Sequence, residues 1–247
     1  MTARPEAVTA VGLTRNFGAT KALDGISFSV GTGEIFGLLG PNGAGKTTVM
    51  RILLTLLRPT SGTATVAGLD VAVRPRQVRA RVGWVPQEQT ADRLLTAREN
   101  LAFMAGMYHL RPKAGRTRVT ELLDFAGLTA HAERLAGALS GGMRRKLELA
   151  MSLVHLPPVL FLDEPTLGLD ISARRALWSY VRDIRAAGTT VVLTTHYLEE
   201  ADALCDRVAI IDRGRIMACD APAVLKHRHG TRSLEGVFLA ATGAGLG

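Results

Sequence analysis

The sequence predicts an α/β fold with a parallel sheet at its centre, an N-terminal antiparallel β subdomain and an inserted α-helical subdomain. Continuous apolar runs, such as residues 159–163 and 191–193, are typical of strands covered on both faces of a parallel sheet. Residues 26–30 alternate between apolar and polar, which indicates a strand with one solvated face. Between about residues 88 and 156, apolar residues recur at helical spacing, so we expect a helical subdomain inserted between strands of the core.

The N-terminal region is predicted to combine several strands with one helix. Its strands are predicted at residues 8–13, 26–30, 34–39 and 63–67. Gly31 and Gly33 favour a turn, so we expect the second and third of these strands to form an antiparallel hairpin. A helix is predicted over residues 49–57 and is expected to end at Arg58 and Pro59, because proline cannot continue a helix.

The rest of the chain is predicted to return to the core after the helical insertion. Its strands are predicted at residues 81–87, 159–163, 189–195, 208–211 and 215–218. The last two flank a hairpin turn that contains Gly214. One helix is expected to end at Gly188, and another to span residues 197–205. The pattern weakens after Asp220, so residues 220–247 are expected to form a C-terminal tail of one domain that spans residues 1–247.

The composition excludes several classes of protein. With 247 residues, 47% of them hydrophobic, the chain is expected to bury a core, which excludes a disordered protein. We find no apolar run near the ~20 residues of a membrane span and expect no secretion signal. Cys205 and Cys219 suit neither a disulfide framework nor a metal site. The net charge of +8 is compatible with nucleic-acid binding, but no dense basic run supports it, so no nucleic-acid partner is expected.

A glycine-rich loop between a predicted strand and a predicted helix carries the strongest chemical signal. It matches the pattern G-x-x-x-x-G-K-[ST] with Gly40, Pro41, Asn42, Gly43, Ala44, Gly45, Lys46, Thr47 and Thr48. The glycines let backbone N–H groups point inward around an anion, and the helix N-terminus adds partial positive charge. Lys46 supplies a full charge, and Thr47 offers a hydroxyl to Mg²⁺. The chain therefore resembles a P-loop NTPase.

Two acidic residues follow the apolar strand at 159–163. Asp163 at the strand end is expected to hold Mg²⁺, through water, against the β- and γ-phosphates. Glu164 beside it is expected to accept a proton from an attacking water or to orient that water. Because the chain also carries a phosphate-binding loop, we expect this acidic pair to belong to the same nucleotide-binding site.

A second predicted anion site precedes the amphipathic helix that starts near Met143. It consists of Ser140, Gly141 and Gly142, which offer a hydroxyl and backbone donors at a helix N-terminus. The three basic residues at 144–146 are expected to keep the first turn electropositive. Because the chain has one phosphate-binding loop, we expect this second site to contact the nucleotide of another molecule.

The order of these motifs resembles the ATP-binding subunit of an ABC transporter. Residues 139–143 stand where that family carries LSGGQ, and residues 168–170 match its D-loop. The resemblance implies the ABC ATPase fold, with ATP and Mg²⁺ as cofactors. It further implies that Phe17 stacks on adenine, that Gln87 joins Thr47 and Asp163 at the metal, and that His196 acts with Glu164 in catalysis.

A finer resemblance is to drug exporters of the daunorubicin-resistance type. Residues 140–147, 196–201 and 233–239 carry it. Met143 replaces the commoner Gln, and Phe17 replaces the commoner Tyr but keeps the stacking face. Ile171-Ser172 replaces the usual proline after the D-loop, and Ser172 is expected to cap the next helix.

The resemblance implies partners and a location. They are a polytopic membrane permease, a homodimer with ATP at its interface, and a peripheral position on the cytoplasmic side of the cell membrane. Two alternatives stay open. One is a soluble ABC ATPase that acts on nucleic acid or ribosomes, although such proteins usually carry two nucleotide domains or a long coiled coil. The other is the ATPase subunit of an importer.

Overall fold

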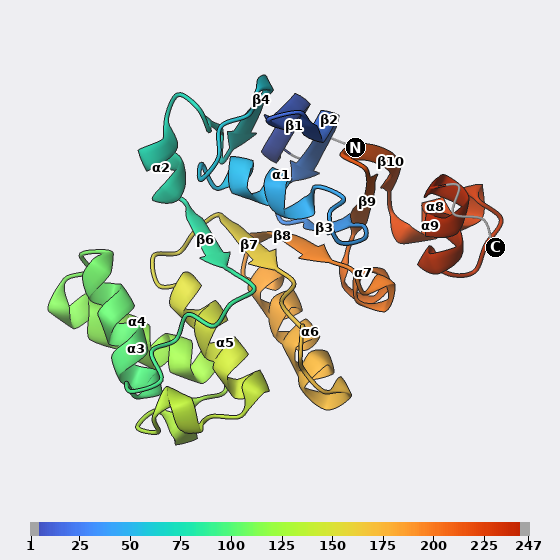
Figure 1. Ribbon diagram of the computed structural model, residues 1–247. Coiled ribbons are helices and arrows are strands. Elements are labelled where there is room, and N and C mark those ends of the chain that lie inside the picture. The colour runs from blue at the N-terminus through green and yellow to red at the C-terminus, as the bar shows by residue number, and fades with distance from the viewer. Residues whose placement is uncertain (1–4, 243–247) are drawn as a thin grey trace.

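The structure, a computed structural model, describes residues 5–242 (Figure 1). The strands are Glu6–Phe17 (β1), Thr20–Gly31 (β2), Ile35–Leu39 (β3), Ser61–Val66 (β4), Leu69–Asp70 (β5), Val82–Val85 (β6), Val159–Asp163 (β7), Thr190–Thr195 (β8), Arg207–Asp212 (β9) and Arg215–Asp220 (β10). The α-helices are Lys46–Leu53 (α1), Pro75–Arg79 (α2), Ala97–Met107 (α3), Pro112–Phe125 (α4), Gly141–Ser152 (α5), Ile171–Ala186 (α6), Leu198–Leu204 (α7), Pro222–Arg228 (α8) and Leu234–Thr242 (α9).

The central sheet has the strand order β10-β9-β3-β8-β7-β6. All its neighbouring strands are parallel except β9 and β10, which form the predicted hairpin. Residues of β3 alternate between two hydrophobic clusters: Phe36 and Leu38 face one, and Ile35 and Leu39 face the other. This sheet is therefore covered on both faces, as its continuous apolar strands predict.

The second sheet is antiparallel, with the order β2-β1-β4-β5. The predicted hairpin between residues 26–30 and 34–39 is wrong, because β2 pairs with β1 and β3 lies in the central sheet. The turn at Gly31 carries the chain from one sheet to the other, where the rings of Phe28 and Phe36 stack with centroids 5.3 Å apart. Apolar contact between the two sheets, rather than backbone hydrogen bonding between β2 and β3, therefore fixes the position of this turn.

Helix α1 lies between the two sheets (Figure 1) and buries Val49, Met50 and Ile52 against both. It begins at Lys46 and ends at Leu53, so the predicted bounds of 49–57 are displaced. Thr55 has a φ of 62°, a left-handed conformation that ends the helix before Pro59 is reached.

The predicted helical insertion is present as α3, α4 and α5, between β6 and β7. These helices lie together beyond the β6 edge of the sheet (Figure 1), and α6 packs beside α5 under the sheet. The parallel central sheet, the antiparallel N-terminal sheet and the helical insertion confirm the predicted fold class. The short helix α2 has no counterpart in the sequence-based prediction.

Within the expected C-terminal tail, residues 222–228 and 234–242 form the helices α8 and α9, and residues 243–247 lie outside the described residues. Leu225 of α8, with Leu234 and Val237 of α9, is buried in the cluster that covers one face of the central sheet. Leu234 and Val237 stand at helical spacing, but both helices are short and offer few such positions, so the sequence pattern was weak there. Among the described residues, none of the helices has the length and apolar character needed to cross a membrane.

Candidate functional site

Four of the predicted site segments converge on one edge of the central sheet. The loop 40–45 follows β3, Gln87 follows β6, Glu164 follows β7 and His196 follows β8. These four strands are parallel, so their carboxyl ends meet at the same edge. A cavity of about 490 Å³ lies there, lined by Ala22, Pro41, Asn42, Gly43, Gly45, Lys46, Thr47, Thr48, Gln87, Glu164, Leu167 and His196.

The loop before α1 has the conformation that the glycines permit. Gly43 and Gly45 have φ values of 81° and 110°, which favour glycine. A Cβ on Gly45 would lie 2.7 Å from Leu23, so the loop also packs closely on β2. Gly45 is the N-cap of α1, and no described side chain caps this helix. The first-turn N–H groups therefore remain donors for an anion in the cavity.

Lys46 is the buried cation of the site. Its Nζ donates to the carbonyl oxygens of Gly40 at 2.7 Å and Pro41 at 3.1 Å. Burial lowers the pKa of Lys46, while the negative charges of Glu164 and Asp163 oppose that shift. The carboxylate of Glu164 lies 4.0 Å from Nζ. The ammonium group is thus held at the loop with a carboxylate on its other side.

Asp163 and Glu164 are fixed to the neighbouring strand β8 by Thr194. The Thr194 hydroxyl donates to Asp163 Oδ1 at 2.5 Å, and the Glu164 N–H donates to both the hydroxyl and the carbonyl of Thr194 at 3.1 Å. Glu164 has a φ of 46°, which is rare for a residue with a side chain. Because such strain is often found at functional sites, it supports a role for Glu164.

His196 lies beside Glu164, with its Nδ1 3.1 Å from Glu164 Oε1. Both side chains line the cavity together with Gln87 and Thr47. The arrangement can therefore present an acid–base pair to a water next to the phosphate-binding loop. Thr47 and Gln87 are exposed at this cavity, and their hydroxyl and amide oxygens are hard ligands that fit Mg²⁺. Asp163 is buried and does not line the cavity, but its charge acts on Lys46, which does.

The second predicted anion site lies outside this cavity, at the N-terminus of α5. The hydroxyl of Ser140 caps α5 by accepting from the Met143 N–H at 3.3 Å. A Cβ on Gly142 would lie 2.9 Å from the Ala173 Cβ, so this glycine lets α5 approach α6 closely. Ser140 and Gly141 are exposed. These residues are thus placed where another molecule can reach them.

The basic residues of α5 differ from the prediction. Arg144 donates to the carbonyls of Ala136, Gly137 and Leu139, and Arg145 is buried among carbonyls of the core. Neither guanidinium is therefore directed to an anion at the helix N-terminus. The sequence shows the charge of these residues but not their internal acceptors.

Two other predicted residues lie away from the cavity lining. Phe17 ends β1 with 47% of its surface exposed, and the Arg15 guanidinium lies 4.6 Å from its ring centroid. The D-loop residue Asp170 is the N-cap of α6 and accepts from the Ala173 N–H at 2.8 Å. The expectation that Ser172 caps this helix is therefore wrong, since α6 already begins at Ile171.

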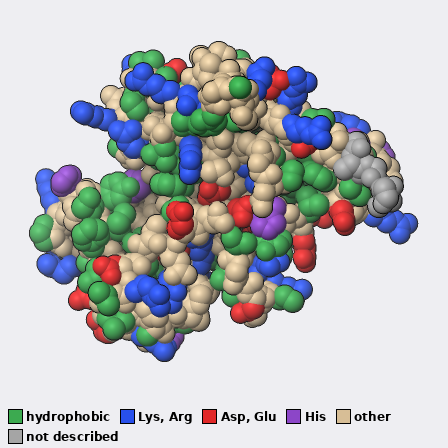
Figure 2. Space-filling model, viewed as in Figure 1, with side chains coloured by type: hydrophobic (Ala, Val, Ile, Leu, Met, Phe, Trp, Pro, Cys, Tyr) green, Lys and Arg blue, Asp and Glu red, His purple; other side chains and the backbone are tan. Residues whose placement is uncertain are grey.

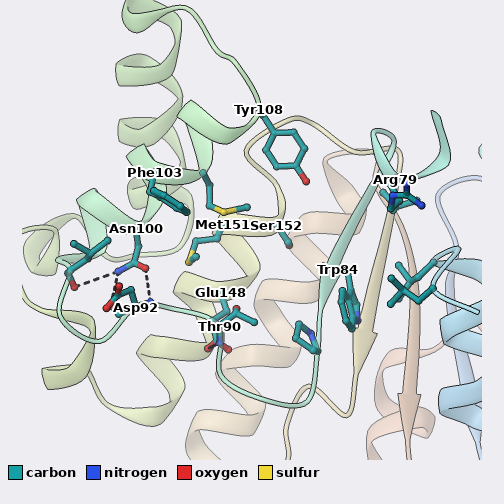
Figure 3. Close-up of a pocket in the computed structure, with 16 residues that line it drawn as sticks. Arg79, Trp84, Thr90, Asp92, Asn100, Phe103, Tyr108, Glu148, Met151 and Ser152 are labelled. Atoms are coloured by element: carbon teal, nitrogen blue, oxygen red, sulfur yellow. Dashed lines mark hydrogen bonds between the residues drawn. The ribbon is translucent and has the colours of Figure 1, made fainter. Parts of the chain in front are cut away.

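A second cavity, of about 440 Å³, lies between β6 and the helical insertion (Figure 3). Trp84, Phe103, Met104 and Tyr108 supply much of its apolar wall, and Glu148 and Thr90 lie at its polar side. Asn100 orders the loop beside it by donating to the Asp92 carbonyl and accepting from the Asp92 N–H. This cavity could not be predicted from the sequence, because its lining residues come from segments far apart in the chain.

Comparisons with known proteins agree with this geometry. The sequence profile of the ABC transporter family matches residues 23–167. The chain is 52% identical to the daunorubicin resistance ATP-binding protein DrrA2 of Streptomyces coeruleorubidus, covering 93% of this chain and 71% of that protein. It is 47% identical to the Nod factor export ATP-binding protein I of Burkholderia orbicola (strain AU 1054), covering 85% and 69%. A solved structure described as an ATP binding subunit of an ABC transporter superposes with a TM-score of 0.83 at 28% identity, covering 96% of this chain and 99% of that one.

Proposed function

The chain belongs to the ABC transporter family, which hydrolyses ATP to power transport, and from this premise we propose that it drives substrate export through a separate membrane permease. The observation that carries the proposal is the cavity where the phosphate-binding loop, Gln87, Glu164 and His196 meet. Related proteins named for daunorubicin resistance and for Nod factor export support export over import. The daunorubicin names favour a drug or antibiotic as the substrate.

The site suits ATP and Mg²⁺. We propose that the free N–H groups of the loop and Lys46 hold the β- and γ-phosphates, while Thr47, Gln87 and Asp163 hold the metal. Bound Mg²⁺ would neutralise charge that develops on the phosphates. Glu164, held by Thr194 and His196, orients the attacking water and takes up its proton. Phe17 would stack on the adenine from its exposed position at the end of β1.

The permease would dock at the second cavity. Its wall is apolar and aromatic, and Phe103 on α3 is 60% exposed. Hydrophobic side chains gather over the helical insertion in Figure 2, whereas basic side chains are spread over the visible face. This distribution favours a protein partner at the insertion over nucleic acid, which requires a concentrated basic surface. Docking there would place the chain at the cytoplasmic side of the membrane, as a peripheral subunit.

The test is to co-express the chain with a candidate polytopic permease and to measure ATP hydrolysis and transport in reconstituted vesicles. Lys46→Ala should remove most hydrolysis, because it deletes a charge that stabilises the departing phosphoryl group. Wild-type turnover in this variant would contradict the assignment of the nucleotide site. Co-purification with ribosomes, without a membrane partner, would favour the alternative class of soluble ATPase.

A further inference from the structure

A buried ion pair on α5 lies beside the second cavity, which its Glu148 helps to line. Arg145 and Glu148 are three residues apart, and Arg145 Nη1 lies 2.9 Å from Glu148 Oε2. Their side chains are only 8% and 1% exposed. Burying two charges is costly unless further hydrogen bonds satisfy them, so the other contacts of the pair are informative.

Arg145 binds the backbone on both sides of the proposed catalytic carboxylate and next to Gln87. Its Nε donates to the carbonyl of Pro165 at 3.0 Å, and its Nη2 donates to that of Asp163 at 3.3 Å. Nη1 donates to the carbonyl of Pro86 at 2.9 Å. One guanidinium therefore fixes the residues that flank Glu164 and the residue that precedes Gln87.

Glu148 binds the other side of the segment that contains Gln87. Its Oε1 accepts from the Thr90 N–H at 2.9 Å, with the Ala91 N–H at 3.5 Å. Glu148, Thr90 and Pro86 all line the second cavity, where Figure 3 shows Glu148 and Thr90 close together. Gln87 and Glu164 line the nucleotide cavity. The ion pair thus contacts lining residues of the second cavity and the chain neighbours of Gln87 and Glu164, which line the nucleotide cavity.

We propose that Arg145 and Glu148 are positioning residues that hold Gln87 and Glu164 in register for ATP hydrolysis and transmit occupancy of the second cavity to them. The proposal rests on the function proposed above. A partner in the second cavity would move the segment 86–91, and the ion pair would carry that movement to the backbone around Glu164. The same helix α5 is capped by Ser140 and begins with Gly141 and Gly142, so it would also respond to contact between these residues and another molecule's nucleotide.

The proposal is tested with Arg145→Lys in the complex with the permease. Lysine keeps the charge, but one ammonium cannot reach the spread acceptors at Pro86, Asp163 and Pro165 together. We expect kcat to fall about 10–100-fold, as for a small misplacement of reacting groups, while the ATP dissociation constant changes less than about threefold. Hydrogen exchange should rise at the amides of residues 88–91 in the folded variant.

Glu148→Gln is the second variant. It keeps the shape and the acceptor for the Thr90 N–H but removes the charge that faces Arg145. We expect a smaller fall in kcat, with ATP affinity again near that of the wild type. Because Glu148→Gln weakens the ion pair without changing Arg145, it tests the same positioning role if Arg145→Lys does not fold.

The matched control is Arg118→Lys on α4. Arg118 also pairs with a glutamate three residues later, Glu121, at 3.2 Å, and donates to the carbonyl of Leu153 at 2.8 Å. It contacts neither Gln87 nor Glu164, so kcat should stay within about twofold of wild type even if the melting temperature falls.

The inference is overturned if both α5 variants keep kcat within about threefold of wild type, if Arg118→Lys loses as much, or if ATP affinity falls in parallel with kcat. A wild-type complex that does not hydrolyse ATP would contradict the proposed function instead, so the two failures are distinguishable.

Discussion

Glu164 combines a strained backbone, two hydrogen bonds to Thr194 and a contact with His196. These features hold its carboxylate in the cavity before any ligand enters. Glu164→Gln keeps the shape and the acceptor, so ATP affinity should persist. Turnover should fall by about 10²–10⁴-fold, the usual span for a general base. Single-turnover hydrolysis and nucleotide binding measure the two effects separately.

Asp163→Asn is the matched variant. It should weaken Mg²⁺ binding as well as turnover, because the carboxylate charge is proposed to face the metal. If Glu164→Gln hydrolyses ATP within a few-fold of wild type, Glu164 is not the base. His196, 3.1 Å away, would then be the next candidate.

Glu200 is fully buried on α7, soon after His196, and accepts a hydrogen bond from the Trp178 indole at 3.1 Å. Burial raises the pKa of Glu200 above its ordinary value. The folded state therefore binds a proton more tightly than the unfolded chain, and stability falls as pH rises above the unfolded pKa of about 4.3. This predicts that the carboxylate limits stability at neutral pH.

Glu200→Gln mimics the protonated form and keeps the acceptor for Trp178. Its melting temperature should exceed that of wild type at pH 7–8, and the advantage should disappear near pH 4. Thermal unfolding by circular dichroism across this range measures the difference. An advantage that grows toward low pH would contradict the prediction.

At the scale of elements, the buried strands were the most predictable. Residues 159–163 were predicted as a strand and form β7 with the same bounds. A short apolar run that ends at Asp163 is too short for a buried helix and is typical of a buried strand. The strand order could not be predicted. The hairpin assigned to residues 26–30 and 34–39 failed because the turn at Gly31 joins two sheets, and a local turn does not show which strand becomes the partner.

The candidate site also has a part that the sequence predicts and a part that it does not. Its residues followed from motifs at strand ends, and the structure brings Lys46, Gln87, Glu164 and His196 to one cavity. The contacts of Arg145 could not be predicted, because its acceptors are backbone carbonyls at or just after the ends of β6 and β7, which the local sequence does not mark. The roles themselves remain predictions that the variants above test.

Helix α3 offers a test of the docking surface. Phe103 lines the second cavity and is 60% exposed, while Met107 on the same helix is 61% exposed and does not line it. Phe103→Ser should weaken permease binding at least about tenfold, as for an aromatic residue at the centre of an interface. ATP binding by the isolated chain should not change.

Met107→Ser is the control and should bind the permease nearly as wild type does. Pull-down with the permease in detergent, followed by titration, compares the two variants. Equal loss in both would indicate a general effect on α3, and no loss in either would exclude the cavity as the docking surface.

At the scale of the whole molecule, each chain carries one phosphate-binding loop and a separate exposed donor site at Ser140 and Gly141. We propose that ATP closes two chains head to tail, so that the donor site of each covers the γ-phosphate of the other. Such a pair is two-fold symmetric and buries two nucleotides. Hydrolysis would remove the γ-phosphate and reopen it.

Glu164→Gln should therefore accumulate as the closed dimer when Mg-ATP is present, and should return to monomers with ADP.

The control is Gly141→Glu added to the same variant. A Cβ at Gly141 would meet only Leu169, at 3.5 Å, so the chain should tolerate the substitution. The new carboxylate would repel the partner's γ-phosphate, so this protein should bind ATP in its own cavity and stay monomeric. Light scattering gives the mass in each state, measured with and without the permease. Monomer alone at saturating Mg-ATP, with the permease present, would refute the head-to-tail dimer, because no weakness of the isolated chain could then account for it.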